Sequence, residues 1–411
     1  MKTLRAVAVC AIAAVALSCG AEPRLDPSVA EQALVGNLSP LKMLVSGDSS
    51  TVFLRDHRSK RTALHYAAYW GDSVFTLELL RAGADVDPAD AHGNSPLYYA
   101  ADGGHAGALD VLLSHGASVN WRDRKGDTPL HRAVFWRHTD TIRLLLERDA
   151  DPDIHGFLGW TPLHIACAEY RDPDDALLIA RLLVEYGASV NPAEDEGFHP
   201  IHYAAIAGHR LLCEFLLDHG EAVDPNGDCH SPLNQAARSG ALDTVKLLVE
   251  RGHDVTRLDH DGDSSLHLAI TAHRTAMGRG TDSPIASGDS LPESFSPDIQ
   301  LQLIDYLIDH GARVDRPDHE GEPPLHRAVK DSQVDVLRLL IARGADVNQP
   351  DGSGWPPLHW AASRDNLEVI DILIGAGADV NAVDLSGQTA IKHAFGNERV
   401  KSLLRVHGAV E

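Results

Sequence analysis

A four-residue phrase recurs ten times along the 411-residue chain at an almost fixed spacing, and this repetition limits the fold more than any other feature. The copies begin at Thr62, Ser95, Thr128, Thr161, His199, Ser231, Ser264, Pro323, Pro356 and Thr389. Their successive spacings are 33, 33, 33, 38, 32, 33, 59, 33 and 33 residues. A unit of this size cannot bury its own apolar face, so the period predicts an array of stacked units in place of a single globular core.

Each copy of the phrase predicts the start of a helix pair. The second position is most often Pro, which suits the first turn of a helix, and the preceding Thr or Ser caps the free amides. A short Ala-rich helix follows, as at Ala67-Ala68, and then a Leu-rich helix, as at Leu77-Glu78-Leu79-Leu80. A glycine such as Gly116 ends the second helix by taking the left-handed conformation. The expected fold class is therefore all-α.

The complete motif, Thr128-Pro129-Leu130-His131 followed by Ala133 and repeated every 33 residues, resembles the ankyrin repeat. The resemblance implies a solenoid of about ten helix-turn-helix units over residues 56–411, joined by β-turn fingers. Residues 26–55 are expected to form N-terminal capping helices. Seven histidines occupy the fourth place of the phrase, where the resemblance implies structural hydrogen bonds between adjacent units.

Two units are longer than the period allows. The extra residues 171–175 are expected to lie between the two helices of their unit. A second insertion at about 271–297 is rich in Gly, Ser, Pro and Asp and has no periodicity, so we expect a flexible surface loop.

The first residues have the character of an export signal. Two cations precede an apolar run from Ala6 to Leu17, which is too short to span a bilayer comfortably, and Cys19 follows. The stretch resembles a bacterial lipoprotein signal, which implies a signal peptide at 1–18, lipidation of Cys19 and a tether at 19–25. Ordinary cleavage that leaves a free protein is the alternative. We expect a periplasmic or outer-membrane location.

The partner surface is expected on the concave face, where turn tips and the exposed sides of the first helices meet. The residue before each phrase should lie at a turn tip, free of packing duties. Aromatic side chains commonly anchor interfaces, and none of the six tryptophans lies on a Leu-rich helix. The predicted partner-binding residues are Tyr66, Trp70, Tyr99, Trp136, Trp160, Phe198, Trp355 and Trp360. Trp121 and Trp360 have an alternative role in filling gaps between units.

Charge and motif content exclude several functions. A net charge of −23 opposes nucleic-acid binding and favours a basic protein partner. The histidines follow the repeat spacing instead of clustering as metal ligands, and Cys167 and Cys213 fall in helical patterns typical of buried thiols. Cys229, predicted in a loop, is the one candidate for a reactive thiol.

The sequence predicts a monomeric protein-binding scaffold without metal, cofactor or catalysis. The Gly288-Asp289-Ser290-Leu291 block matches an esterase motif but lies in the insertion without a strand or partner residues around it. An immunity-type protein that neutralises a toxin is an alternative binding role. An enzyme that uses the 271–297 loop is the alternative from another class.

Overall fold

The computed structural model describes residues 24–168, 172–220, 231–276 and 296–410. The predicted signal peptide, the lipidation site Cys19, most of the tether, Cys229, the turn-tip His230 and the 288–291 block lie outside these ranges. The described residues form 21 α-helices, α2 to α22, and short 3-10 helices, with isolated β-bridges in place of strands. This composition confirms the predicted all-α class.

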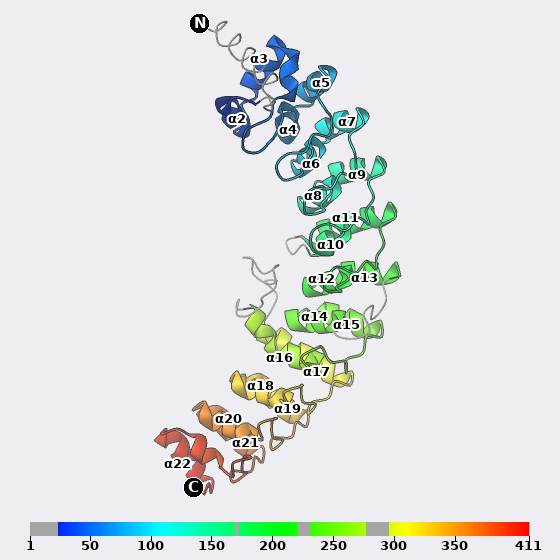
Figure 1. Cartoon of the computed structure of the whole chain (residues 1–411). Helices are drawn as coiled ribbons and strands as arrows, with labels where there is room; N and C mark the ends of the chain where they lie inside the picture. Colours follow the sequence, from blue (N-terminus) through cyan, green and yellow to red (C-terminus); the bar gives the residue numbers. More distant parts are fainter. Residues whose placement is uncertain (1–23, 169–171, 221–230, 277–295, 411) are drawn as a thin grey trace. The chain divides into compact units, whose positions relative to one another are not determined.

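The helices gather into two stacks that divide between Gly197 and Phe198. The N-terminal stack contains α2 (Pro27–Leu34), α3 (Ser39–Gly47), η1 (Ser49–Phe53), α4 (Ala63–Tyr69), α5 (Ser73–Arg81), α6 (Pro96–Asp102), α7 (Ala106–Ser114), α8 (Pro129–Phe135), α9 (Thr139–Glu147), η2 (Phe157–Gly159), α10 (Pro162–Cys167) and α11 (Pro173–Glu185). Its first helices α4, α6, α8 and α10 pack on one another in a layer, and the second helices α5, α7, α9 and α11 form the layer behind them (Figure 1). At the amino end, α2, α3 and η1 pack together and η1 contacts α4.

The C-terminal stack repeats this two-layer arrangement. It contains α12 (Pro200–Ile206), α13 (Arg210–Asp218), α14 (Pro232–Ser239), α15 (Leu242–Glu250), α16 (Ser265–Ala276), α17 (Pro297–Asp309), α18 (Pro324–Lys330), α19 (Val334–Ala342), α20 (Pro357–Ser363), α21 (Leu367–Gly375), η3 (Ala390–His393) and α22 (Glu398–Val406). The first helices α12, α14, α16, α18 and α20 pack in sequence, and η3 occupies the next position. The last unit thus replaces its first helix by a short 3-10 turn.

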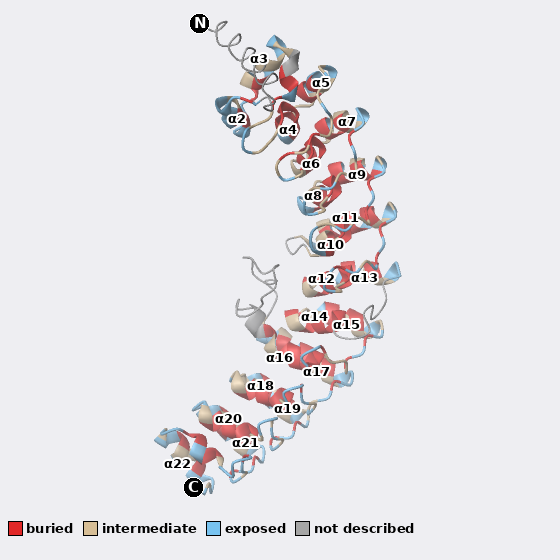
Figure 2. Cartoon of the chain, in the orientation of Figure 1, coloured by how far each residue is buried: buried red, intermediate tan, exposed pale blue. Residues whose placement is uncertain are grey.

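Helix α8 illustrates how the phrase begins each unit. Pro129 takes the first helical position, and the Thr128 side chain and the His131 side chain cap each other's backbone in a reciprocal capping box. Leu130 is completely buried, as are the corresponding leucines of the neighbouring units (Figure 2). Burial of a leucine side chain contributes roughly 2 kcal/mol, and one such side chain per unit supports the stacking.

The ends of the second helices follow the predicted glycine rule. After α7, Gly116 adopts φ 88° and the amide of Ala117 donates to the carbonyl of Leu112 at 3.1 Å. This left-handed turn satisfies carbonyls that the helix leaves free and directs the chain toward the next finger.

The two insertions differ from their predicted form. Asp172 caps α11, and residues Pro173–Asp175 form its first turn, so this insertion lengthens the second helix to 13 residues instead of forming a loop between helices. In the C-terminal stack α16 continues to Ala276, so the first residues expected in the 271–297 loop are helical. Asp and Pro at a helix start stabilise the first turn, which explains the extension of α11. Residues 277–295 lie outside the described ranges.

Cys167 and Cys213 are buried, as predicted. None of the helices in the described parts of the chain combines the length and apolar character needed to cross a membrane.

Candidate protein-binding surface

The phrase histidines form a ladder of hydrogen bonds between units. In the first unit, the Thr62 amide donates to Nδ1 of His65 at 3.0 Å, and Nε2 of His65 lies 3.2 Å from the Asn94 carbonyl of the next finger. His131 makes the equivalent contacts with Thr128 and the Trp160 carbonyl. Because Nδ1 accepts, Nε2 carries the hydrogen and the ring is neutral. Burial lowers the pKa of His65 to about 4, which agrees with this state.

In four fingers an aspartate bonds to a side chain nine residues later, which gives a second ladder. The hydroxyl of Tyr99 donates to Asp90 at 2.7 Å, the indole of Trp360 donates to Asp351 at 2.7 Å, and Arg327 pairs with Asp318 at 2.7 Å. Each pair ties a finger to the helix that follows it.

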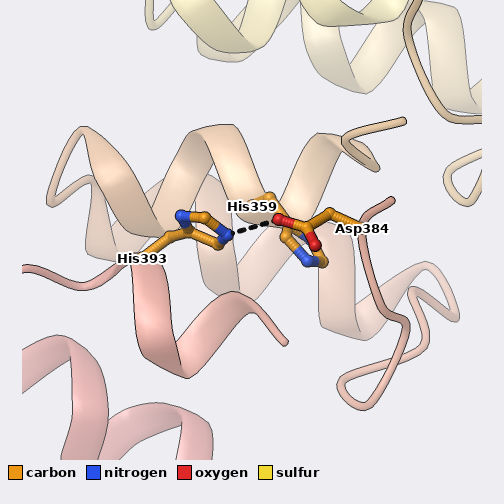
Figure 3. Close-up of side chains that lie close together, drawn as sticks. All are labelled: His359, Asp384 and His393. Atoms are coloured by element: carbon orange, nitrogen blue, oxygen red, sulfur yellow. Dashed lines mark hydrogen bonds and ion pairs between the residues drawn. The ribbon is translucent and has the colours of Figure 1, made fainter. Parts of the chain in front are cut away.

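This ladder accounts for a cluster of three possible metal ligands, His359, Asp384 and His393, whose ligand atoms lie within 4.8 Å of one another (Figure 3). Nε2 of His393 lies 2.8 Å from Asp384, in the same relation as Tyr99 to Asp90. Nε2 of His359 is 2.9 Å from the Gln388 carbonyl, as in the other phrase histidines. Nε2 of both histidines is therefore already used in the repeat hydrogen bonds, which favours a structural role over metal coordination, and Nδ1 of His359 is buried without a hydrogen-bond partner.

Several side chains at the predicted turn tips are buried or bonded to neighbouring parts of the stack, contrary to expectation. Asn94 is 8% exposed and its amide donates to the Tyr99 hydroxyl, and Asp263 is 7% exposed and pairs with Arg327. Asp127 accepts a hydrogen bond from the Phe157 amide of the next finger. Adjacent fingers pack closely enough that the tip side chains stabilise their neighbours.

Two of the predicted anchors lie in the core, and burial removes them from any partner surface. Tyr66 is 1% exposed and Tyr99 is 5% exposed. Tyr99 bonds to Asp90 and accepts from Arg61 at 2.6 Å, and burial raises its pKa to about 12, so it acts as a neutral structural donor. Tyr99 is enclosed by its own finger and by Arg61 and Tyr69 of the preceding unit, which the sequence pattern did not reveal.

Trp70 and Trp136 remain exposed, at 41% and 50%, at the carboxyl ends of α4 and α8. Beside them lie Tyr69, 36% exposed, and Phe135, 51% exposed, each in an edge-to-face contact with its tryptophan at about 5 Å. We call Tyr69, Trp70, Phe135 and Trp136 the aromatic patch. Tyr69 and Phe135 were not among the predicted anchors, although both stand directly before a tryptophan at the same place in their units.

Helix α6 holds the two halves of the patch together. Its last residue, Asp102, accepts the Trp136 indole at 2.8 Å and Arg132 at 2.6 and 2.8 Å. On the other side, the rings of Tyr69 and Tyr99 lie 5.9 Å apart. The indole of Trp70 donates to the Ala33 carbonyl at 2.7 Å, which fixes the patch to the amino-terminal helices. The tryptophans are thus oriented by hydrogen bonds while their rings remain in solvent.

The other predicted anchors are half-buried on fingers or on a first helix. Trp160 lies at a finger of the N-terminal stack, and Phe198 begins the C-terminal stack against His202 and Tyr203. Trp355 and Trp360 contact each other at 4.8 Å, and Trp360 is covered by Lys330. Trp121 donates to the Gly93 carbonyl at 2.7 Å and so joins two fingers, in agreement with its alternative role.

Comparison with family models identifies the repeat. A model described as ankyrin repeats (3 copies) matches residues 30–123, 64–156 and 151–227. A second model, ankyrin repeats (many copies), matches residues 233–277, 300–341, 325–374 and 358–404. Together these matches extend over most of the chain.

Similar curated proteins share only part of their length with this chain. Human palmitoyltransferase ZDHHC13 is 42% identical over 89 residues, which are 21% of this chain and 14% of that protein. A putative palmitoyltransferase ZDHHC13 of Danio rerio is 32% identical over 165 residues, 38% of this chain and 26% of that protein. The putative ankyrin repeat protein L271 of Acanthamoeba polyphaga mimivirus is 28% identical over 168 residues, 40% of this chain and 21% of that protein.

Proposed function

This chain belongs to the ankyrin-repeat family, and on that premise we propose that it is a protein-binding scaffold whose partner docks on the aromatic patch of the N-terminal stack. Ankyrin repeats support a protein–protein interaction role for the chain as a whole. The choice of this surface rests on one observation: four large aromatic side chains from two units are solvent-exposed while hydrogen bonds fix both indoles in place.

The physical argument is one of preorganisation. A large aromatic ring buries much apolar area on docking, and a ring that is already oriented loses little side-chain entropy. Exposed aromatic side chains in contiguous groups mark interaction sites, whereas single exposed apolar residues are ordinary. Patch positions are therefore expected to carry most of the binding energy.

Site-specific photo-crosslinking tests this surface directly. A photoreactive phenylalanine analogue replaces Phe135 in one protein and Phe395, an exposed ring of the C-terminal stack, in another. We expect a defined protein adduct from position 135 in native cells and no matching adduct from position 395. Equal adducts from the two positions would show that the patch is not the docking site.

Substitutions supply the second arm of this experiment. Y69S/F135S removes two exposed rings that form no side-chain hydrogen bond in the described ranges, so it preserves the tryptophan anchors and the stack. In lysine-directed chemical crosslinking of native cells, which leaves both tryptophans in place, this double variant should lose the adduct with the partner, whereas the control L385S/F395S should retain it. Far-UV circular dichroism of both variants checks that the helices are intact.

The proposal includes export to a bacterial envelope with a lipid at Cys19. Its support is the short apolar run after Lys2 and Arg5, followed by Cys19. The relatives named above are eukaryotic or viral, so this part of the proposal rests on the residues of the chain itself. Mass spectrometry of the mature protein should find an acylated Cys19 at the amino terminus, and Cys19→Ser should leave the precursor uncleaved. An unmodified mature chain would refute the anchor while leaving the binding surface untouched.

A further inference from the structure

The negative charge of the chain is distributed unevenly. Residues 24–150 hold 14 Lys and Arg against 16 Asp and Glu, whereas residues 151–411 hold 20 against 42. Nearly all of the net charge of −23 therefore belongs to the part of the chain that follows the aromatic patch. The charge of the whole chain does not describe the surroundings of the patch.

The first three fingers of the N-terminal stack are rich in cations. Seven Lys or Arg residues lie on them: Arg55, Arg58, Lys60, Arg61, Arg122, Arg124 and Lys125. Backbone contacts join these fingers in a row, because the Ala91 amide donates to Ser59 at 2.8 Å and the Arg124 amide donates to His92 at 3.2 Å. We call this row of residues 55–61, 89–94 and 122–127 the basic fingers.

The carboxylates of the basic fingers are already committed to local structure. Asp56 accepts from the Ser59 amide and Asp123 accepts from the amides of Lys125 and Asp127. Asp90 is buried and bonds to Tyr99, and Asp127 accepts from the Phe157 amide. These four carboxylates stabilise the finger turns through hydrogen bonds. They do not form a group that neutralises the neighbouring cations.

Three of the cations stay available for a partner. Arg58, Arg124 and Lys125 are exposed and make no ion pair with a carboxylate in the described ranges. Lys125 lies 4.9 Å from the ring centroid of Phe157, an exposed aromatic of the next finger. Cationic and aromatic groups therefore share the same edge of the stack.

The acids that are exposed nearby belong to the second helices and the turns after them. These residues are Glu78, Asp85, Asp140, Glu147, Asp149 and Asp151. This part of the N-terminal stack is thus polarised, with free cations on the basic fingers and exposed carboxylates on the side of the second helices, whereas the exposed Asp195 and Glu196 lie on a later finger and Glu31 lies on α2.

Direct contacts connect the basic fingers to the aromatic patch. The Arg61 guanidinium lies 4.4 Å from the ring centroid of Tyr99, and the Tyr99 ring contacts that of Tyr69 in the patch. Arg132 lies over the rings of Tyr98 and Phe135, at 5.6 and 5.0 Å. The basic fingers and the aromatic patch thus form a candidate surface whose two parts are connected through the buried Tyr99 and through Arg132, and none of these connecting contacts involves an exposed acid.

We propose that this surface binds an acidic segment of a partner protein, with carboxylates on the basic fingers and an aromatic or long aliphatic side chain on the aromatic patch. The inference rests on the proposed function and specifies its partner chemistry, and it reverses the expectation of a basic partner. Complementary charge at the fingers gives orientation and fast association, while the patch supplies the apolar contact.

A protein segment fits this surface better than a nucleic acid or an anionic membrane. Binding to a phosphate backbone depends on many Lys and Arg contacts, and only three cations here are free of local partners. The rest of the chain is strongly acidic and would repel an extended polyanion. A short acidic segment needs only the few cations present.

Peptide display on the purified full chain tests the proposal. A random 16-residue library is selected on the wild-type protein, on R124E/K125E, on W70A/W136A and on the control R81E/R143E. Arg81 and Arg143 are exposed on α5 and α9, so the control makes the same charge change on the second helices. Enriched peptides are resynthesised and their affinities are measured by fluorescence anisotropy at low and high salt.

We expect wild-type peptides that combine negative charge with aromatic or leucine residues. They should bind R124E/K125E at least tenfold more weakly and bind R81E/R143E within twofold of wild type. Neutral or basic winners, no enrichment, or unchanged affinity for R124E/K125E would overturn the inference. If the selected neutral or basic peptides still require Trp70 and Trp136 for binding, the acidic-segment inference is wrong but the proposed function stands. If the selected acidic peptides bind W70A/W136A with unchanged affinity, the aromatic patch is not the docking site and the proposed function is wrong.

The other two classes of ligand are tested with the same proteins. A fluorescent 20-nucleotide polyuridine RNA and vesicles containing phosphatidylglycerol are titrated beside the selected peptides. Tighter binding of either probe than of the peptides, lost in R124E/K125E and kept in R81E/R143E, would assign the basic fingers to that ligand and overturn the acidic-segment proposal.

Discussion

Acidification should weaken the packing of α4, because the hydrogen bonds of His65 require a neutral ring. Nδ1 of His65 accepts the Thr62 amide, so a proton on Nδ1 would place two N–H groups against each other. Burial lowers the pKa of this histidine from 6.5 to about 4. The unfolded chain binds the proton first, so the stabilisation is complete above pH 6.5 and is lost as the pH falls from 6.5 toward 4.

The size of the effect follows from the two pKa values. At pH 5 the unfolded imidazole is almost fully protonated and the folded one only to about one tenth. Linkage then gives a loss of about 2 kcal/mol relative to neutral pH, with a slope near 1.2 kcal/mol per pH unit at pH 5. Burial also lowers the pKa of His131, so the same direction holds for the neighbouring unit.

The C-terminal stack is expected to respond less simply. Burial lowers the pKa of His267 to about 4, but it raises the pKa of Asp263 to about 6. A carboxyl with a raised pKa gains stability on acidification between about pH 6 and 3.8, which offsets part of the histidine effect. The N-terminal stack is therefore the better place for the measurement.

Hydrogen exchange followed by mass spectrometry measures the opening free energy of peptides from α4 at pH 7.5 and pH 5, after correction for intrinsic exchange rates. The full chain is compared with His65→Gln, which is less stable at both pH values but carries no titrating ring. We expect the parent to lose about 2 kcal/mol more than this variant between the two pH values. His92→Gln is the control, since His92 is exposed on a finger. Equal pH dependence in the parent and His65→Gln would refute the role assigned to the ladder.

Three further changes test the packing by denaturant unfolding. Leu130→Ala should lower the free energy of unfolding by about 3 kcal/mol because Leu130 is completely buried, whereas Leu385→Ala should change it by less than about 0.5 kcal/mol because Leu385 is 83% exposed. Gly352→Ala should cost about 1–3 kcal/mol, since its new methyl group would overlap the Glu320 carbonyl oxygen of the adjacent finger, and a neutral result would disprove this close approach. Gly375→Ala meets no atom within 4 Å at the end of α21 and should instead stabilise the protein by about 0.5 kcal/mol. Thr128→Val removes the hydroxyl that contacts His131 at 2.8 Å and should cost about 1 kcal/mol.

Much of the architecture was predictable because it depends on short-range patterns that repeat. The Thr-Pro start, the buried leucine of the phrase and the terminal glycine each act within one helix turn, so they locate the helix pairs without knowledge of contacts. The exposure of Trp70 and Trp136 was also predictable, because both stand at the end of a first helix, outside the pattern of buried positions. Insertions were harder: residues 173–175 obey a helix-start rule that competes with the repeat length.

Whether an individual side chain is buried or exposed depends on contacts with the neighbouring unit. The position after the phrase histidine holds Tyr66, which is buried, but in another unit it holds Arg132, which stays half-exposed and orients Asp102. Sequence alone determined that this chain is a stack of helix pairs with exposed tryptophans and a large negative charge. Tertiary structure decided that Tyr99 lies in the core, that Tyr69 and Phe135 complete the patch, and that the finger acids are used locally while nearby cations stay free. The reason is that burial and pairing between units depend on contacts about 30 residues apart, where the finger of one unit contacts the first helix of the unit before it.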